Sequence, residues 1–159
     1  MRTVYKVFAF LIALEVAIQA SMMAFAVAGL GIWVDQEGGV FDKANAEAIF
    51  EGDLKFTGVV GMMIHGMNGM MVIPAIALLF LIISFFAKVP GGIKWAALVL
   101  ALVVLQVTLG LFGHENPYAG MLHGFNALVL FASAFWAGKR VNGTVAAAGT
   151  RAPSEREHV

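Results

Sequence analysis

Hydrophobic residues fall in four long runs that short polar breaks separate. A helix rises about 1.5 Å per residue, so about 20 consecutive apolar residues cross the hydrocarbon core of a bilayer. Each run reaches that length; the runs cover residues 7–34, 57–87, 93–113 and 118–138. The pattern predicts an all-α fold, an integral membrane four-helix bundle that sits in a lipid bilayer.

The breaks between the runs differ in their chemistry. Residues 35–55 form an acidic loop, in which we expect a short surface helix over residues 44–50. Residues 90–92 read Pro-Gly-Gly, which is typical of a turn, and residues 113–117 form a tight turn before the last run.

Lysine and arginine fall on one side of this four-pass arrangement, and short loops rich in these residues stay in the cytoplasm. Only Lys43 and Lys55 lie on the other side; the rest are Arg2, Lys6, Lys88, Lys94, Lys139, Arg140, Arg151 and Arg156. We therefore expect a plasma (inner) membrane protein with both termini in the cytoplasm. Residues 1–140 form the transmembrane domain, and residues 141–159 are expected to be a disordered cytoplasmic tail.

Composition supports a membrane location and excludes several kinds of function. The chain is 60% hydrophobic and 13% charged, whereas soluble domains carry about 25% charged residues. Its formal net charge is zero, so no general attraction to nucleic acid is expected. Cysteine is absent, which removes disulfides and thiolate metal sites. The first run is about twice as long as a signal-peptide core, so we expect it to be a retained helix.

A short pattern recurs in the second and fourth runs. His-Gly-x-Asn occurs at His65 with Asn68, and again at His123 with Asn126. The histidines occupy corresponding positions, each about two turns from the outer end of its helix. A four-helix bundle with internal two-fold symmetry would therefore place the two imidazoles at one depth.

The first and third runs also match each other. Each carries Gln-x-Ser/Thr near its middle, at Gln19 and at Gln106. The matches together indicate an internal repeat of two helical hairpins, each a helix with a central glutamine followed by a helix with a histidine.

The paired histidines suit a haem. Imidazole ligates iron well, and helical bundles hold cofactors between side chains of facing helices. A porphyrin also needs small residues on the face of its ligands, four positions away. Those positions are small, namely Gly61 and Gly69 for His65, and Ala119 and Ala127 for His123. We predict one haem b with His65 and His123 as its metal ligands.

Other polar residues within the runs are candidates to support that site. Asn68 and Asn126 lie three residues after the histidines and share their faces. A ligating histidine donates its second ring proton to an acceptor, for which Gln19, Gln106 and Glu15 are available. An ionisable residue inside a membrane helix usually faces inward and has a function, so Glu15 is a candidate for proton handling or hydrogen bonding.

These residues give the chain a resemblance to the haem A synthase family, whose members have two similar four-helix halves with haem-ligating histidines in the second and fourth helix of each. The chain resembles one such half, with His65 and His123 in those places, and the LQVTLGLF segment at residues 105–112 is similar to the family's third helix. The resemblance implies the same fold and haem ligands. The family's catalytic glutamate is absent, since Met62 and Gly120 stand three residues before the histidines, and so is its cysteine pair. Haem hydroxylation is therefore not expected.

The sequence leaves three kinds of function open. The first is electron transfer or haem handling by a cytochrome b-like protein, with a quinone or a redox protein as partner and a homo-oligomer as one possible state, rather than a stand-alone enzyme. The second is a cofactor-free accessory or structural membrane protein, in which the polar residues only fasten helices. The third is a small transporter or channel lined by Glu15, Gln19 and Gln106.

Overall fold

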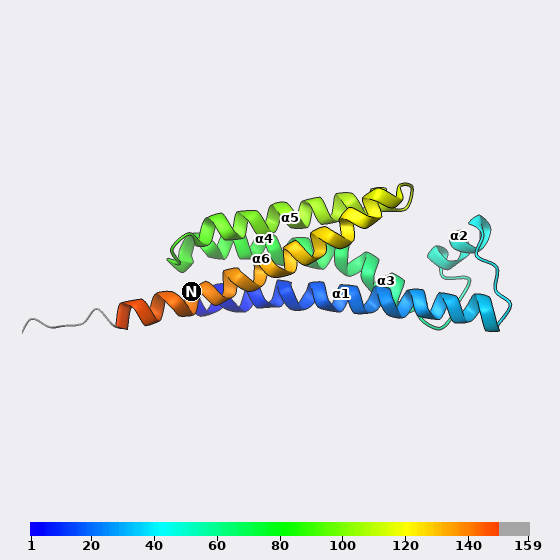
Figure 1. The fold of residues 1–159 in the computed structure, drawn as a ribbon, viewed down its shortest axis with the longest axis horizontal. Helices are drawn as coiled ribbons and strands as arrows, with labels where there is room; N and C mark the ends of the chain where they lie inside the picture. The colour runs from blue at the N-terminus through cyan, green and yellow to red at the C-terminus, as the bar shows by residue number, and fades with distance from the viewer. Residues whose placement is uncertain (150–159) are drawn as a thin grey trace, which may run out of the picture. The chain divides into compact units, whose positions relative to one another are not determined.

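The computed structural model describes residues 1–149, and the secondary structure within that range is helical, with no strand. The elements, shown in Figure 1, are α1 (Arg2–Gln36), α2 (Lys43–Glu51), α3 (Val59–Met67), the π-helix η1 (Asn68–Val72), α4 (Ile73–Ala87), α5 (Gly92–Gly113) and α6 (Pro117–Gly149). Four helical segments are long and apolar enough to cross a membrane, namely Arg2–Gln36, Val59–Ala87, Gly92–Gly113 and Pro117–Val141. The all-α membrane fold is therefore confirmed, with one helix for each apolar run.

Helix α6 extends further than its apolar run. We expected the span to end at residue 138 and a disordered tail to begin at residue 141, but the helix continues to Gly149. Alanines at 146–148 explain the extension, because alanine has the highest helix propensity of any residue. The rest of the expected tail, residues 150–159, lies outside the described residues.

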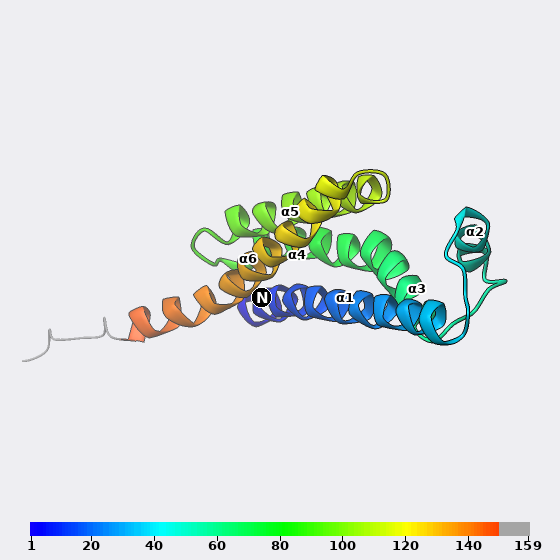
Figure 2. The same cartoon turned by 45° about the vertical axis from the view of Figure 1, so that its right-hand side comes forward.

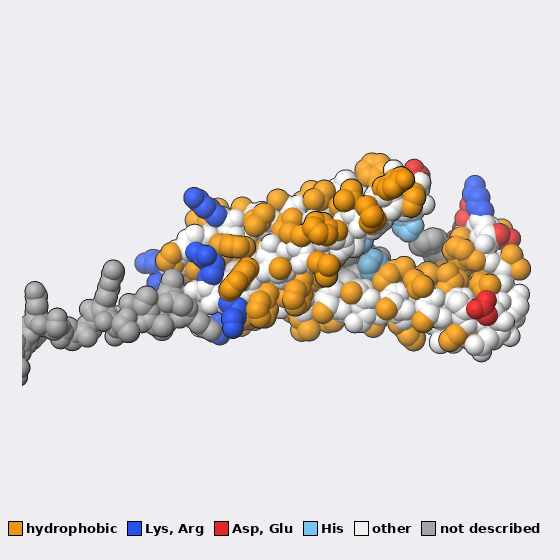
Figure 3. Space-filling model, viewed as in Figure 1, with side chains coloured by type: hydrophobic (Ala, Val, Ile, Leu, Met, Phe, Trp, Pro, Cys, Tyr) orange, Lys and Arg blue, Asp and Glu red, His pale blue; other side chains and the backbone are white. Residues whose placement is uncertain are grey.

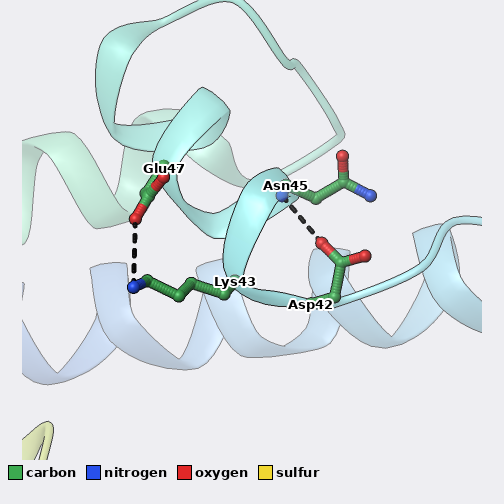
Figure 4. A network of polar contacts seen from close by, with 4 residues as sticks. All are labelled: Asp42, Lys43, Asn45 and Glu47. Atoms are coloured by element: carbon green, nitrogen blue, oxygen red, sulfur yellow. Dashed lines mark hydrogen bonds and ion pairs between the residues drawn. The ribbon is translucent and has the colours of Figure 1, made fainter.

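The acidic loop contains the short helix α2, at the place where one was expected. Asp42 caps it, since its Oδ1 accepts a hydrogen bond of 2.8 Å from the backbone N–H of Asn45. Figure 4 shows this cap beside the exposed ion pair of Lys43 and Glu47, 3.9 Å apart. The helix ends at Gly52, whose φ of 87° closes the last turn. Figure 2 shows α2 apart from α1, to which a connecting loop joins it.

The chain divides into two compact units. Unit 2 is Glu15–Pro74, and unit 1 is Met1–Leu14 together with the chain from Ala75 onward. In unit 2, α1 and α3 approach closely through glycines. A Cβ on Gly61 would overlap the carbonyl oxygen of Met22, and one on Gly29 would overlap that of Thr57. Such small residues let membrane helices pack backbone to backbone.

The core of unit 1 joins the start of α1 to α4 and α5. Tyr5 is 1% exposed; its hydroxyl donates to the carbonyl of Gly92 at 3.1 Å, and its ring lies 4.6 Å from that of Phe80. Phe10 packs against Phe135 of α6, with ring centroids 5.5 Å apart. The buried tyrosine thus satisfies its polar atom while it fastens α1 to the beginning of α5.

Basic side chains gather at one end of unit 1, as the blue atoms in Figure 3 show. There the Arg2 guanidinium donates to the carbonyl of Lys88 at 3.2 Å, and the Arg140 guanidinium lies 5.6 Å from the centre of the Trp95 ring. The start of α1, the α4–α5 connection and the basic part of α6 therefore meet at the same end of this unit.

The glycine packing in unit 2 gives a direct prediction. Gly61→Leu should lower the free energy of unfolding by about 1–3 kcal/mol, because the new side chain has to push α3 away from α1. Gly66→Ala is the matched control, since a Cβ at Gly66 meets nothing within 4 Å. Thermal unfolding in detergent, followed by circular dichroism, measures both. Equal melting temperatures for the two variants would contradict the close approach.

Candidate functional site

His123 is held against the backbone of the facing helix. Its Nδ1 lies 3.0 Å from the carbonyl oxygen of Gln106 on α5. A carbonyl oxygen only accepts hydrogen bonds, so Nδ1 is the donor in this contact. Gly110 makes room for this approach, because a Cβ there would lie 3.1 Å from Cε1 of the imidazole. Gly110 belongs to the LQVTLGLF segment on which the family resemblance rests, but its place beside the imidazole was not predicted.

The second histidine site, which we define as His123, Asn126 and Gln106, is linked by several hydrogen bonds between α5 and α6. Gln106 Nε2 donates to the carbonyl of His123 at 3.1 Å. Asn126 is buried, and its Nδ2 donates to Gln106 Oε1 at 2.7 Å and to the carbonyl of Leu102 at 3.0 Å. Both ends of the Gln106 amide therefore have partners within the α5–α6 hairpin.

His65 repeats this arrangement in unit 2. Its Nδ1 lies 3.4 Å from the carbonyl oxygen of Gln19 on α1, which is the residue that matches Gln106. The contact is longer than in the second site, and the position four residues after Gln19 is Met23, where α5 has Gly110. Both imidazoles thus meet the glutamine carbonyl of the facing helix.

The hydroxyl groups follow the same repeat. Ser21 donates to the carbonyl of Ala17 at 2.9 Å, and Thr108 donates to that of Val104, also at 2.9 Å. Each hydroxyl lies two residues after its glutamine and bonds one turn back. The internal repeat inferred from sequence therefore recurs in the hydrogen bonds as well as in the residues.

The first histidine site, defined as His65, Asn68, Gln19 and Glu15, differs in how its amides are used. Asn68 Nδ2 donates to Glu15 Oε2 at 2.7 Å. Glu15 occupies the position that Leu102 has in the other half. Both asparagines bond to the residue at that position, Asn68 to the carboxyl of Glu15 and Asn126 to the backbone carbonyl of Leu102. Gln19 is 8% exposed, and neither Nε2 nor Oε1 of its amide has a hydrogen-bond partner within the described residues.

A π-helical turn follows His65 and has no counterpart in α6. The N–H of Ile73 bonds to the carbonyl of Asn68, five residues back. Pro74 explains the wider turn, because it has no N–H and its ring would clash with the carbonyl four residues earlier. The carbonyl of Gly69 is then left without a donor in the helix ladder, because Ile73 bonds elsewhere and Pro74 has no N–H to offer. The proline was the sequence signal for this turn.

The two glycines that we expected beside His65 have different roles. Gly61 is buried against Met22 and Ala26 of α1, so it serves helix packing and does not leave room for a macrocycle as expected. A Cβ on Gly69 would make ordinary van der Waals contact with Gln19 Oε1, at 3.6 Å, so Gly69 lies beside the Gln19 amide. No group of three His, Cys, Asp or Glu residues that could hold a metal ion occurs in residues 1–149, which leaves single histidines as the ligands to consider.

The contrast between the two glutamines predicts different effects of one substitution. Gln106→Met should lower the free energy of unfolding by about 1–3 kcal/mol, because it leaves buried polar partners unsatisfied. Gln19→Met removes an amide that has no hydrogen-bond partner within the described residues, so it should leave the free energy of unfolding unchanged or raise it. Melting temperatures of the two purified variants test this, and an equal loss in both would contradict the contrast.

Comparisons of this chain with known protein families, with curated proteins and with solved structures find no match. The resemblance to the haem A synthase family therefore stays a prediction that rests on the residues named above.

Proposed function

We propose that this chain is a small membrane haem protein in which His65 and His123 ligate the iron of one b-type haem. The observation that carries the proposal is that both histidines have their Nδ1 against the backbone carbonyl of a glutamine, at 3.4 and 3.0 Å. Two histidines from matching helices, each oriented by a backbone carbonyl, would be suitable ligands for a haem iron.

The chemistry of the donor set fits haem. A haem iron would be ligated through Nε2 of each ring, because Nδ1 donates to the glutamine carbonyl and that contact orients the imidazole. Neutral ligands add no charge to an iron porphyrin, which suits a site inside the membrane, where charge is costly. Bound haem would supply one-electron chemistry.

The surrounding residues then orient the ligands. In the second histidine site, Asn126 and Gln106 lock α6 against α5 at the level of His123. In the first, Asn68 and Glu15 link α3 to α1. This arrangement supports electron transfer or haem handling, with a quinone or a redox protein as the partner, and it includes no group placed for hydroxylation.

The basic end of unit 1 supports a cytoplasmic location for both termini. Arg2, Lys88 and Arg140 meet there, and the turn with Glu115 is at the opposite end of α5. By the positive-inside rule, the basic end faces the cytoplasm of a plasma (inner) membrane and the histidines lie towards the outer leaflet.

The second histidine site also favours a different function, that of an accessory membrane protein without a cofactor. Its amides are satisfied within the hairpin, which is how polar residues fasten membrane helices. The two functions differ in whether the purified protein is coloured.

The absorption spectrum tests the haem proposal. Protein purified from haem-sufficient cells should give a sharp Soret band and split bands after reduction with dithionite. His65→Ala and His123→Ala should each lose the low-spin spectrum, since either change removes one iron ligand. His114→Ala is the control, because His114 is exposed in the α5–α6 turn, and its spectrum should equal that of the unaltered protein.

Two results would overturn the haem proposal. One is a colourless protein that still has its helical circular dichroism. The other is a haem spectrum that neither His65→Ala nor His123→Ala changes.

Cysteine labelling tests the orientation, and the chain has no native cysteine. Glu115→Cys should react with a membrane-impermeant maleimide in intact cells, because its turn faces outward. Lys94→Cys should react only after the membrane is permeabilised. Both positions are exposed, so the reverse labelling pattern would refute a cytoplasmic location of the termini.

A further inference from the structure

The repeat is asymmetric at its glutamines. Gln106 Nε2 donates to the carbonyl of His123, and Gln106 Oε1 accepts from Asn126 Nδ2. Its match, Gln19, is 8% exposed and therefore 92% buried. Neither Nε2 nor Oε1 of its amide has a hydrogen-bond partner in the part of the chain that the structure describes. A buried amide with both atoms unsatisfied is costly, so its place in a membrane helix needs an explanation.

The cause of the asymmetry is local to unit 2. Glu15 takes the amide of Asn68, at 2.7 Å, so Asn68 does not bond to Gln19 as Asn126 does to Gln106. The π-turn before Pro74 also leaves the carbonyl of Gly69 without a ladder donor. Gly69 lies beside the amide, and its missing side chain leaves space there. The residues that differ from the second site thus all lie around Gln19.

These groups define the chemistry of a ligand. Gln19 Nε2 needs an acceptor, whereas Gln19 Oε1, the carbonyl of Gly69 and the carboxyl of Glu15 all accept. A hydroxyl group does both, because it accepts one hydrogen bond and donates another. A bare cation would leave Nε2 unsatisfied, and a carbonyl compound would leave the acceptors unsatisfied.

The surroundings restrict the ligand further. Glu15 and Gln19 lie within the apolar span of α1, and the residues that flank Asn68 and Gly69 are exposed apolar methionines, at 64% for Met67 and 56% for Met70. A ligand that reaches this place through hydrocarbon has an apolar body as well as a hydroxyl group.

We propose that the Gln19 amide, together with Glu15 and the carbonyl of Gly69, binds the hydroxyl group of a membrane quinol. The inference rests on the proposed function, because it names the class of electron donor to a haem on His65. The binding itself needs only the residues of unit 2. Gln106, whose amide bonds are used within its hairpin, has no such role.

Binding of a short-tailed benzoquinol to the full-length protein in detergent, measured anaerobically by equilibrium dialysis, tests the proposal. Binding should saturate, and the oxidised quinone should bind at least about tenfold more weakly, because it cannot donate to Gln19 Oε1. Gln19→Met should weaken quinol binding by at least about tenfold.

Two control variants keep this test sharp. Thr108→Ala removes a hydroxyl that is bonded within its own helix in the other half, and it should leave the dissociation constant for quinol unchanged. Ser21→Ala, which removes a hydroxyl bonded within its own helix, should also leave it unchanged and should not disturb folding.

The outcomes separate this inference from the proposed function. Absence of saturable quinol binding would show that only water occupies the cluster, and would overturn the inference even if the protein carries haem. Equal binding of quinol and a long-chain alcohol would overturn the assignment to quinol. A colourless protein that binds quinol through Gln19 would support the site and overturn the haem proposal alone.

Discussion

The contact on which both histidine sites depend is a single hydrogen bond from an imidazole to the backbone of the facing helix. The backbone carbonyls of a helix already accept hydrogen bonds from N–H groups of the same helix. A donor from another helix therefore reaches them only where the two helices are close. In unit 1, Gly110 allows that closeness, and Nδ1 of His123 lies 3.0 Å from the carbonyl oxygen of Gln106. In unit 2, Met23 stands at the position that matches Gly110, and Nδ1 of His65 lies 3.4 Å from the carbonyl oxygen of Gln19. This bond fixes the orientation of each ring.

Two copies of one hairpin design have thus acquired different uses of the same residues. In the second histidine site, where the position that matches Glu15 is the apolar Leu102, Asn126 donates to Gln106. In the first histidine site, where the position is Glu15, Asn68 donates to the carboxyl and the amide of Gln19 has no partner within the described residues. The two halves differ at Glu15 and at the π-turn before Pro74, and the glutamine amide is satisfied in one half and unsatisfied in the other.

Much of the fold was predictable from the sequence, because apolar length alone selects helices in a bilayer. The sequence offered Gln19, Gln106 and Glu15 as acceptors for the histidine rings, but each Nδ1 lies against the backbone carbonyl of a glutamine and not against a side chain, which residue spacing alone does not indicate. Pro74 signalled the π-turn only in retrospect, because a proline in a membrane helix is accommodated in several ways.

Other features depend on contacts that sequence spacing does not specify. Gly61 was expected beside a cofactor, yet its face is filled by α1, because glycine serves packing and ligand approach equally well. The bond from Asn68 to Glu15 requires knowledge of which residues on α1 and α3 are level with each other. The extension of α6 to Gly149 includes alanines at 146–148, whose hydropathy does not distinguish a helix from a disordered tail.

The central claim is that each histidine contributes one ligand to the same iron. Electron paramagnetic resonance of the oxidised, purified protein at low temperature tests it most directly. The account predicts a low-spin ferric signal typical of two imidazole ligands, with one haem for each chain. A high-spin signal in the unaltered protein, or the absence of any haem signal, would contradict it.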